Sequence, residues 1–248
     1  MNRLFALLFT YVFMSMGYTS SAIQLLPVTV DVRNQAALQR GARIYMNYCS
    51  GCHALRYMRY DRMAIDLGLT TFAGQIDPEL LRNNLIFTEA KIQDPIQISM
   101  PPDDARQWFG KVPPDLSLTA REHGADWLYT YLKSFYADSQ RPFGANNLVL
   151  PDVAMPNILA PLQGQVVRVE PFQDERPRDI LSLVLLKPGE MSPHQFDSML
   201  TDLVTFLVYV GEPAQLQRRT IGWYVLAFLL GLVVITYQLK KAYWKKIN

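Results

Sequence analysis

Two cysteines and a histidine stand close together early in the chain, in the run Cys49-Ser50-Gly51-Cys52-His53. Thiols one helical turn apart can each add to a vinyl group of a porphyrin, and the adjacent histidine can then bind the iron. The spacing C-x-x-C-H is typical of covalent haem attachment. The sequence therefore predicts one c-type haem (haem c) held by Cys49 and Cys52, with His53 as an iron ligand.

Other uses of a cysteine pair fit less well. These are the only two cysteines in 248 residues, so a disulfide framework is excluded. A zinc site of four cysteines, or of two cysteines and two histidines, lacks ligands because His123 and His194 are isolated. A thioredoxin-type redox pair would need a βαβ context, whereas this motif ends a helical pattern that begins after Gln35. The apolar stripe of that helix is Leu38, Ala42, Tyr45 and Met46.

The two ends of the chain indicate export and a membrane anchor. Residues 1–22 are typical of a secretory signal peptide, with Arg3, an apolar run over residues 4–16 and small residues ending at Ala22. An uncleaved anchor helix is the alternative for this segment. Residues 221–239 carry no charge and would form about 28 Å of helix, which is long enough to span a bilayer. We therefore expect one transmembrane helix at the C-terminus.

The charges on either side of that span predict its orientation. Residues 240–248 form a basic tail with four lysines, against Arg218 and Arg219 before the span. This bias places the tail on the cytoplasmic or matrix side of the inner membrane, and the haem domain in the periplasm or intermembrane space. Residues 23–220 carry 19 Lys+Arg and 22 Asp+Glu, and this mildly acidic balance argues against nucleic acid as a partner.

Residues 23–220 are expected to form one exported haem domain without internal repeats. Asp77 and Pro78 predict the start of a short helix that runs to about Asn84. Residues 95–114 contain five prolines and are expected to form a loop over the haem edge. Asp126 is expected to cap a helix running towards Phe135, and residues 165–169 and 180–186 are expected to form a small strand pair.

The last soluble element has the clearest helical pattern. Ser192 is expected to be its N-cap and Pro193 its first residue, and the helix should end at Gly211. Its apolar stripe is Phe196, Met199, Leu200, Leu203, Leu207 and Val210. An N-terminal helix with the haem motif and a C-terminal amphipathic helix are the pair that a class I cytochrome c fold packs crosswise. We predict a mainly α, class I cytochrome c-like domain with a small β insert, plus one C-terminal transmembrane helix.

The sixth ligand of the iron decides between electron transfer and binding of a small ligand. Met100, Met155 and Met191 each stand beside a proline or a helix cap that would fix a loop, and a following proline favours an extended backbone. In a class I cytochrome the ligand loop lies between the third and the C-terminal helix, which removes Met100. We favour Met155 over Met191 because Met191 adjoins the start of its own helix, and His123 is a competing ligand.

Several motifs together resemble the cytochrome c1 family, the haem-bearing subunit of the quinol–cytochrome c oxidoreductase (cytochrome bc1 complex). The resemblance covers essentially the whole mature chain. Its residues are Arg40-Gly41-x3-Tyr45-x3-Cys49-x2-Cys52-His53, Pro113-Pro114-Asp115-Leu116-Ser117 with Arg121 shortly after, Met155-Pro156, and the single C-terminal anchor. The C-x-x-C-H motif is shared by all c-type cytochromes, whereas the P-P-D-L-S block with the anchor is far more restrictive.

The resemblance implies roles for particular residues. His53 and Met155 would be the axial ligands of the iron, Cys49 and Cys52 would hold the porphyrin, and Arg121 would face a haem propionate. The implied activity is one-electron transfer from the Rieske iron–sulfur protein to cytochrome c. Cytochrome b would be a further partner in a dimeric complex, and quinol would be oxidised on another subunit, so no catalytic residue is expected on this chain.

Two other functions remain open from the sequence. A membrane-tethered electron carrier, or the cytochrome subunit of a terminal oxidase, would keep the haem motif and the anchor. It would need neither the P-P-D-L-S block nor the long insert before Met155. A haem-based gas sensor would need an open sixth position on the iron and a signalling output.

Overall fold

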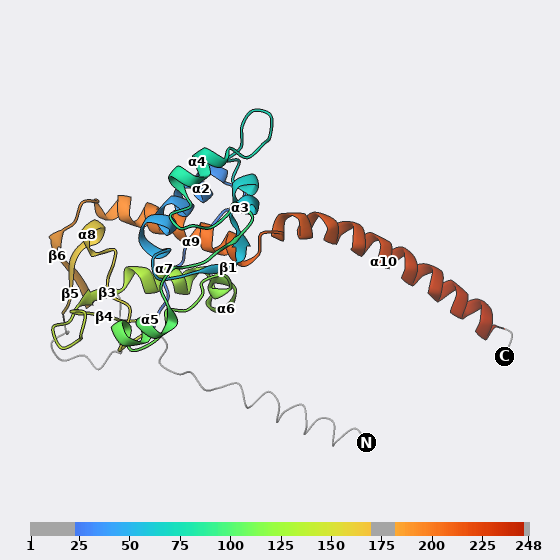
Figure 1. Cartoon of the computed structure of the whole chain (residues 1–248). Helices are drawn as coiled ribbons and strands as arrows, with labels where there is room; N and C mark the ends of the chain where they lie inside the picture. The colour runs from blue at the N-terminus through green and yellow to red at the C-terminus, as the bar shows by residue number, and fades with distance from the viewer. Residues whose placement is uncertain (1–22, 170–181, 246–248) are drawn as a thin grey trace, which may run out of the picture. The chain divides into compact units, whose positions relative to one another are not determined.

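The computed structural model describes residues 23–169 and 182–245 (Figure 1). The expected signal peptide therefore lies outside the described residues. The chain divides into two compact units. Unit 1 comprises Met1–Pro27 and Thr130–Pro193, and unit 2 comprises Val28–Tyr129 and His194–Asn248. The helix α7 (Ala125–Lys133) crosses from unit 2 into unit 1.

Unit 2 is mainly helical and contains the haem motif. Its other elements are α2 (Gln35–Ile44), the π-helical segment η1 (Tyr45–Cys49), β1 (Leu55–Arg59), α3 (Tyr60–Asp66), α4 (Pro78–Asn84), β2 (Pro95–Ile96), α5 (Pro102–Phe109), α6 (Thr119–His123), α9 (Pro193–Gly211) and α10 (Gln215–Trp244). The strands β1 and β2 pair antiparallel, with Leu55 opposite Ile96. The mainly helical fold with small sheets that the sequence predicts is confirmed.

Local capping chemistry explains the helix starts that were predicted. The Asn34 side chain accepts a hydrogen bond of 3.1 Å from the Ala37 backbone N–H and caps α2. The Asp77 carboxylate accepts bonds from two backbone N–H groups of α4, and Pro78 is the first residue of that helix. The predicted helix from Pro78 to Asn84 is therefore confirmed, as is α9 between Pro193 and Gly211.

The expected loop over residues 95–114 is wrong, because this stretch contains β2 and α5. Its prolines begin the helix: Pro101 is the N-cap and Pro102 is in the first turn, where a missing N–H costs nothing. The left-handed Gly110, with φ 75°, ends α5. The expected helix cap at Asp126 is also wrong, because α7 begins one residue earlier, at Ala125. The Asp126 carboxylate instead accepts a bond of 2.8 Å from the Val28 N–H.

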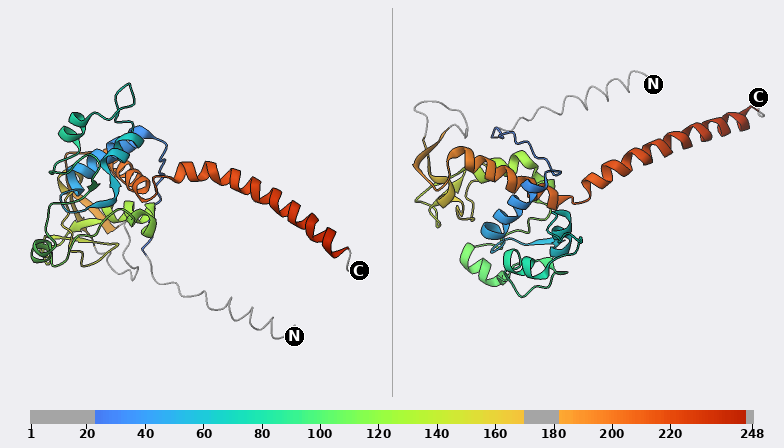
Figure 2. Two further views of the ribbon diagram at one scale, coloured as in Figure 1. Left: turned by 45° about the vertical axis from the view of Figure 1, so that its right-hand side comes forward. Right: turned by 90° about the horizontal axis from the view of Figure 1, so that it is seen from above.

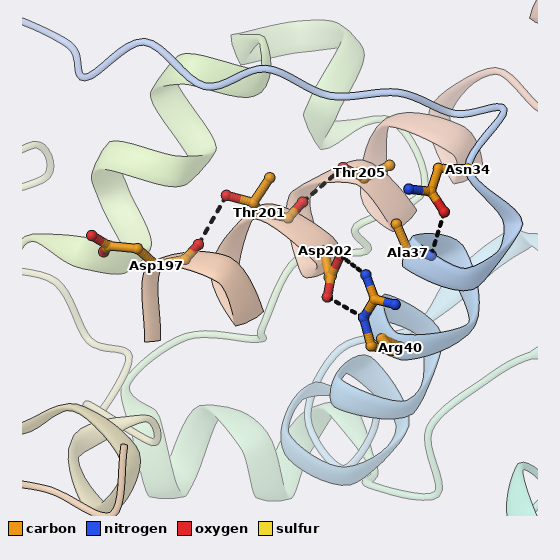
Figure 3. A network of polar contacts seen from close by, with 7 residues as sticks. All are labelled: Asn34, Ala37, Arg40, Asp197, Thr201, Asp202 and Thr205. Atoms are coloured by element: carbon orange, nitrogen blue, oxygen red, sulfur yellow. Dashed lines mark hydrogen bonds and ion pairs between the residues drawn. The ribbon is translucent and has the colours of Figure 1, made fainter. Parts of the chain in front are cut away.

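The helices α2 and α9 cross at close range, and Figure 3 shows their polar contact. The Arg40 guanidinium donates two hydrogen bonds, of 2.6 and 2.9 Å, to the Asp202 carboxylate. Beside this pair, Gly41 has no room for a side chain: a Cβ there would lie 2.2 Å from the Asp202 carbonyl oxygen and 2.7 Å from the Phe206 Cβ. Tyr45, one helical turn on, is fully buried, and its ring lies 5.8 Å from that of Phe206. The haem motif therefore follows a helix that is fixed tightly against α9.

Replacing Gly41 by alanine should destabilise this crossing by about 1–3 kcal/mol or more, because the added methyl group meets backbone atoms that cannot move independently. Thermal unfolding of the detergent-solubilised chain, followed by circular dichroism, measures the effect. Arg43→Ala on the exposed side of the same helix is the matched control and should change stability by less than about 0.5 kcal/mol. Equal stability of the two variants would contradict the close crossing.

Unit 1 carries the small β structures. Its elements are β3 (Phe135–Ala137), β4 (Ala145–Asn147), α8 (Ala160–Gln163), β5 (Gly164–Arg168) and β6 (Leu183–Pro188). The strands β5 and β6 pair antiparallel, so the predicted strand pair is confirmed, with residues 180 and 181 outside the described part of the chain. The β3–β4 hairpin was not predicted; in it Phe135 lies opposite Asn147. This hairpin leads directly into the segment with Met155.

The C-terminal helix α10 is one continuous helix in all views (Figures 1 and 2). It contains the predicted span over residues 221–239 and extends beyond it at both ends. None of its residues is buried in the structure. Within the described residues it is the one helix that is long and apolar enough to cross a membrane.

Candidate haem-binding site

The end of η1 brings the three motif side chains together on one tight turn. The backbone N–H groups of Cys52 and His53 donate to the Cys49 carbonyl at 3.1 and 2.9 Å. The Ser50 N–H donates to the Tyr45 carbonyl at 3.0 Å and closes the preceding turn. The two sulfurs and the imidazole therefore come from a single short segment at the C-terminal end of a helix.

The two cysteines are free thiols, and Cys49 is buried whereas Cys52 is half-buried. Burial, with a smaller contribution from Cys52, raises the pKa of the Cys49 thiol to about 12, and burial also raises the pKa of Cys52. A reactive redox dithiol needs a lowered thiol pKa, typically at a helix N-terminus, which this turn does not provide. A thioether is uncharged and suits a buried position. The environment therefore fits covalent haem attachment better than dithiol chemistry.

His53 is held in the tautomer that an iron ligand needs. Its Nδ1 lies 2.8 Å from the Pro114 carbonyl oxygen, which can only accept, so Nδ1 carries the proton and Nε2 has a free lone pair. Burial is the main cause that lowers the pKa of His53, so the ring is neutral at neutral pH. A neutral imidazole with Nδ1–H bonded to a carbonyl is the usual state of a metal-binding histidine.

The P-P-D-L-S block lies along the segment that follows the motif. Besides the bond that the Pro114 carbonyl accepts from His53, the Leu116 N–H donates to the Ala54 carbonyl at 2.9 Å. The Asp115 carboxylate accepts from the Arg56 N–H at 2.9 Å. The Ser117 hydroxyl accepts from the Tyr57 N–H at 3.2 Å. The block therefore positions the His53 ring and satisfies the backbone after it, a role that the sequence alone did not assign.

Tyr45 also holds the motif in place. Its hydroxyl donates to the His53 carbonyl, and its fully buried ring packs near Phe206 of α9. Sequence reasoning assigned Tyr45 only to the apolar stripe of the helix. The spacing of Tyr45 before the motif is part of the family resemblance. No local sequence signal predicts that its hydroxyl bonds to the His53 carbonyl.

Met155, the expected second ligand, lies in unit 1. Its side chain packs against a small buried cluster of Phe135, Ala145 and Val153. The Tyr131 hydroxyl donates a hydrogen bond of 3.4 Å to the Met155 sulfur. Burial raises the pKa of Tyr131, so the hydroxyl keeps its proton and remains a donor. Sequence reasoning placed Tyr131 on a helix without assigning it a role.

The remaining candidates lie elsewhere. Met191 follows β6, and its backbone N–H donates to the Leu162 carbonyl in α8. Met100 lies between β2 and α5. The His123 ring stacks on Trp127 with ring centres 4.2 Å apart. The aliphatic part of Arg121 lies beside Gly211, where a Cβ would be 3.1 Å from its Cγ. Within the described ranges, Arg121 makes no hydrogen bond or ion pair with the motif, so its expected role towards a propionate rests on the resemblance.

Comparison with known proteins places these features in a family. The model of the cytochrome C1 family matches residues 29–247. A protein named cytochrome c1 from Allochromatium vinosum is 50% identical over 88% of this chain and 88% of its own length. A protein named ammonia monooxygenase gamma subunit from Nitrosomonas europaea is 41% identical over 91% of this chain and 90% of its own length. Among solved structures, a chain of a hyperthermophilic respiratory complex III covers 100% of this chain and 98% of its own length, with a TM-score of 0.43 and 16% identity.

Proposed function

Because this chain belongs to the cytochrome c1 family, we propose that it is the haem-bearing electron-transfer subunit of a membrane quinol–cytochrome c oxidoreductase. The observation that carries this proposal is the arrangement of Cys49, Cys52 and His53 on one turn, with the His53 Nδ1 bonded to Pro114. The chain contributes electron transfer, and quinol oxidation belongs to another subunit of the complex.

Each residue of the motif would have a separate role in holding a haem c. Cys49 and Cys52 would form the two thioethers, and His53 would offer Nε2 to the iron while Pro114 keeps its ring oriented. A haem held in this way supplies a one-electron couple and needs no proton or group transfer. We propose Met155 as the second axial ligand and Arg121 as a partner of a propionate.

The proposed partners follow from the family and from the anchor. One electron would pass from the Rieske iron–sulfur protein to this chain and then to cytochrome c. The helix α10 would hold the chain in the inner membrane beside cytochrome b, with the haem domain in the periplasm or intermembrane space. The complex would be dimeric.

The name of the relative from Nitrosomonas europaea points to a different enzyme. The family model and the relative with 50% identity favour the quinol–cytochrome c oxidoreductase for this chain. A tethered electron carrier or a terminal oxidase subunit would have the same haem chemistry but different partner subunits. The partner subunits that bind the chain are therefore what an experiment should identify.

Extraction of membranes with a mild detergent, followed by purification through a tag on this chain, tests the proposal. We expect cytochrome b and a Rieske iron–sulfur protein to co-purify, together with quinol-dependent reduction of cytochrome c. Co-purification of oxidase or monooxygenase subunits instead would overturn the proposed complex. Isolation of the chain alone, fully loaded with haem, would favour a tethered carrier.

A further inference from the structure

The strand β1 follows the C-x-x-C-H motif and presents three large side chains to solvent. Arg56 and Arg59 are exposed, and Tyr57 between them is 74% exposed. Tyrosine and arginine are among the residues that contribute most to binding at protein interfaces. The motif turn also reaches the surface, because Gly51 is exposed and Cys52 is half-buried. Only three residues separate Cys52 from Arg56, so a protein that covers the strand also lies beside the haem motif.

The backbone of this strand is fixed, so its exposed side chains start from defined positions. Leu55 and Met58 of the same strand are buried. The Tyr57 N–H donates to the Ser117 hydroxyl at 3.2 Å, and Leu55 pairs with Ile96 of β2. A surface that is already ordered loses less conformational freedom on binding than a mobile loop does.

The two guanidinium groups of this strand are not used in ion pairs. Within the residues that the structure describes, the Arg56 and Arg59 side chains form no hydrogen bond or ion pair. The Asp115 carboxylate accepts two backbone N–H bonds, one of them from Arg56. The next cation, Arg62, is by contrast paired with Asp66 at 2.5 Å. In the described structure, β1 therefore presents two positive charges that are available to a partner.

These charges are opposite in sign to the average of the domain. Residues 23–220 carry 19 Lys+Arg and 22 Asp+Glu. At about 0.1 M salt the Debye length is about 10 Å, so charges at a contact act on a partner while remote acidic residues are screened. The field beside the motif therefore favours a partner with a negatively charged surface.

We propose that Arg56, Tyr57 and Arg59 form a docking surface for the electron acceptor, and that this acceptor is a small cytochrome c with an acidic surface. This inference rests on the proposed function, in which the haem at the motif passes its electron to a cytochrome c. The donor would be held in the same complex, whereas a soluble acceptor has to find the haem by diffusion. Complementary charge mainly raises the rate of diffusional encounter, so the acceptor is the partner that gains from the two arginines.

Two forms of one acceptor test the proposal on the unchanged, haem-loaded complex. A basic cytochrome c is used as it is and after succinylation of its lysines, which makes the same protein acidic. The complex is first reduced with ascorbate, and stopped flow then follows the transfer of one electron from its ferrous haem to the ferric haem of the acceptor. We expect the acidic form to react faster, with a second-order rate constant that falls between about 0.1 and about 0.5 M salt. Faster reaction of the basic form would overturn the proposal.

Substitutions on the strand locate the effect. Arg56→Gln with Arg59→Gln should lower the rate constant for the acidic form about tenfold and flatten its salt dependence. Arg43→Gln with Arg82→Gln is the matched control, because both residues are exposed and the loss of charge is the same; its rate constant should stay nearly unchanged. Tyr57→Ala should raise the KM for the acceptor about fivefold or more and leave the limiting rate and the midpoint potential unchanged.

The outcomes separate the docking surface from the proposed function. If the Arg56 and Arg59 variant reacts like its control while cytochrome c is still reduced, the docking surface is wrong and the proposed function stands. If the complex reduces neither form of cytochrome c, the proposed function itself is wrong. Arg56→Lys with Arg59→Lys keeps both charges and should restore the salt dependence; a slow, salt-independent rate there would contradict the role of charge. If the variants lose haem, the comparison of the two acceptor forms decides alone.

Discussion

Replacing both Cys49 and Cys52 by alanine should abolish covalent haem in this chain. Both thioethers would be lost, and His53 alone would leave the porphyrin without a covalent link. Denaturing electrophoresis with haem staining is the measurement, and we expect a complete loss of the stained band at the position of the chain. The unchanged protein should keep its haem through acid–acetone extraction.

Ser50→Ala provides the matched control for the cysteine variants. Ser50 lies in the same turn, and its hydroxyl donates to the Met46 carbonyl at 2.7 Å. It has no thiol to offer a porphyrin, so the variant should stain like the unchanged protein. Extraction of haem from the unchanged protein by acid–acetone would show that attachment is not covalent and would contradict the proposed roles of both cysteines.

Met155→Leu should remove the sulfur-to-iron charge-transfer absorption of the oxidised protein and lower its potential. Axial ligands shift haem potentials over about 0.8 V, so a fall of tenths of a volt is expected when the thioether is lost. Absorption spectroscopy and a potentiometric titration measure the two effects. Covalent haem should be retained, because Met155 takes no part in the thioethers.

Met100→Leu and Met191→Leu are the controls for this variant. Both remove a thioether beside a proline or a helix cap, yet in the described parts of the chain Met155 alone has a recorded hydrogen bond to its sulfur. The two control proteins should keep their absorption and potential. Loss of the absorption in Met191→Leu, with Met155→Leu unaffected, would move the ligand to the start of α9.

Local signals predicted the helix starts correctly where one side chain or one proline determines the end. Asp77 with Pro78, and Pro193 at the start of α9, act within three residues of the helix that they begin. The five prolines of residues 95–114 predict a loop, whereas the structure has β2 and α5 in this stretch. Pro102 shows why the loop was not formed: a proline in the first turn is compatible with a helix. The position of a proline within an element therefore determines whether it begins a helix or interrupts one.

Contacts between distant positions could not be predicted in this way. Arg40 and Asp202 are 162 positions apart, and neither carries a local signal for the other. The β3–β4 hairpin is short, and its buried Asn146 and Asn147 are residues that strands usually avoid. The C-x-x-C-H motif can be recognised in the sequence because all of its residues lie within five positions. The hydrogen-bond partners that support its residues come from other elements, and only the fold brings them together.

The bond between His53 and Pro114 closes a loop of about sixty residues, and this has a consequence for how the chain tolerates change. The entropy of closing a loop grows only with the logarithm of its length, so doubling this loop would cost about 0.6 kcal/mol. It contains a small turn in which Thr70 pairs with Ile76 and the Phe72 side chain is fully exposed. Extra residues inserted at that turn would leave His53 and its carbonyl partner Pro114 undisturbed. This region can therefore accept new segments, such as a tag or an additional binding surface, at small thermodynamic cost.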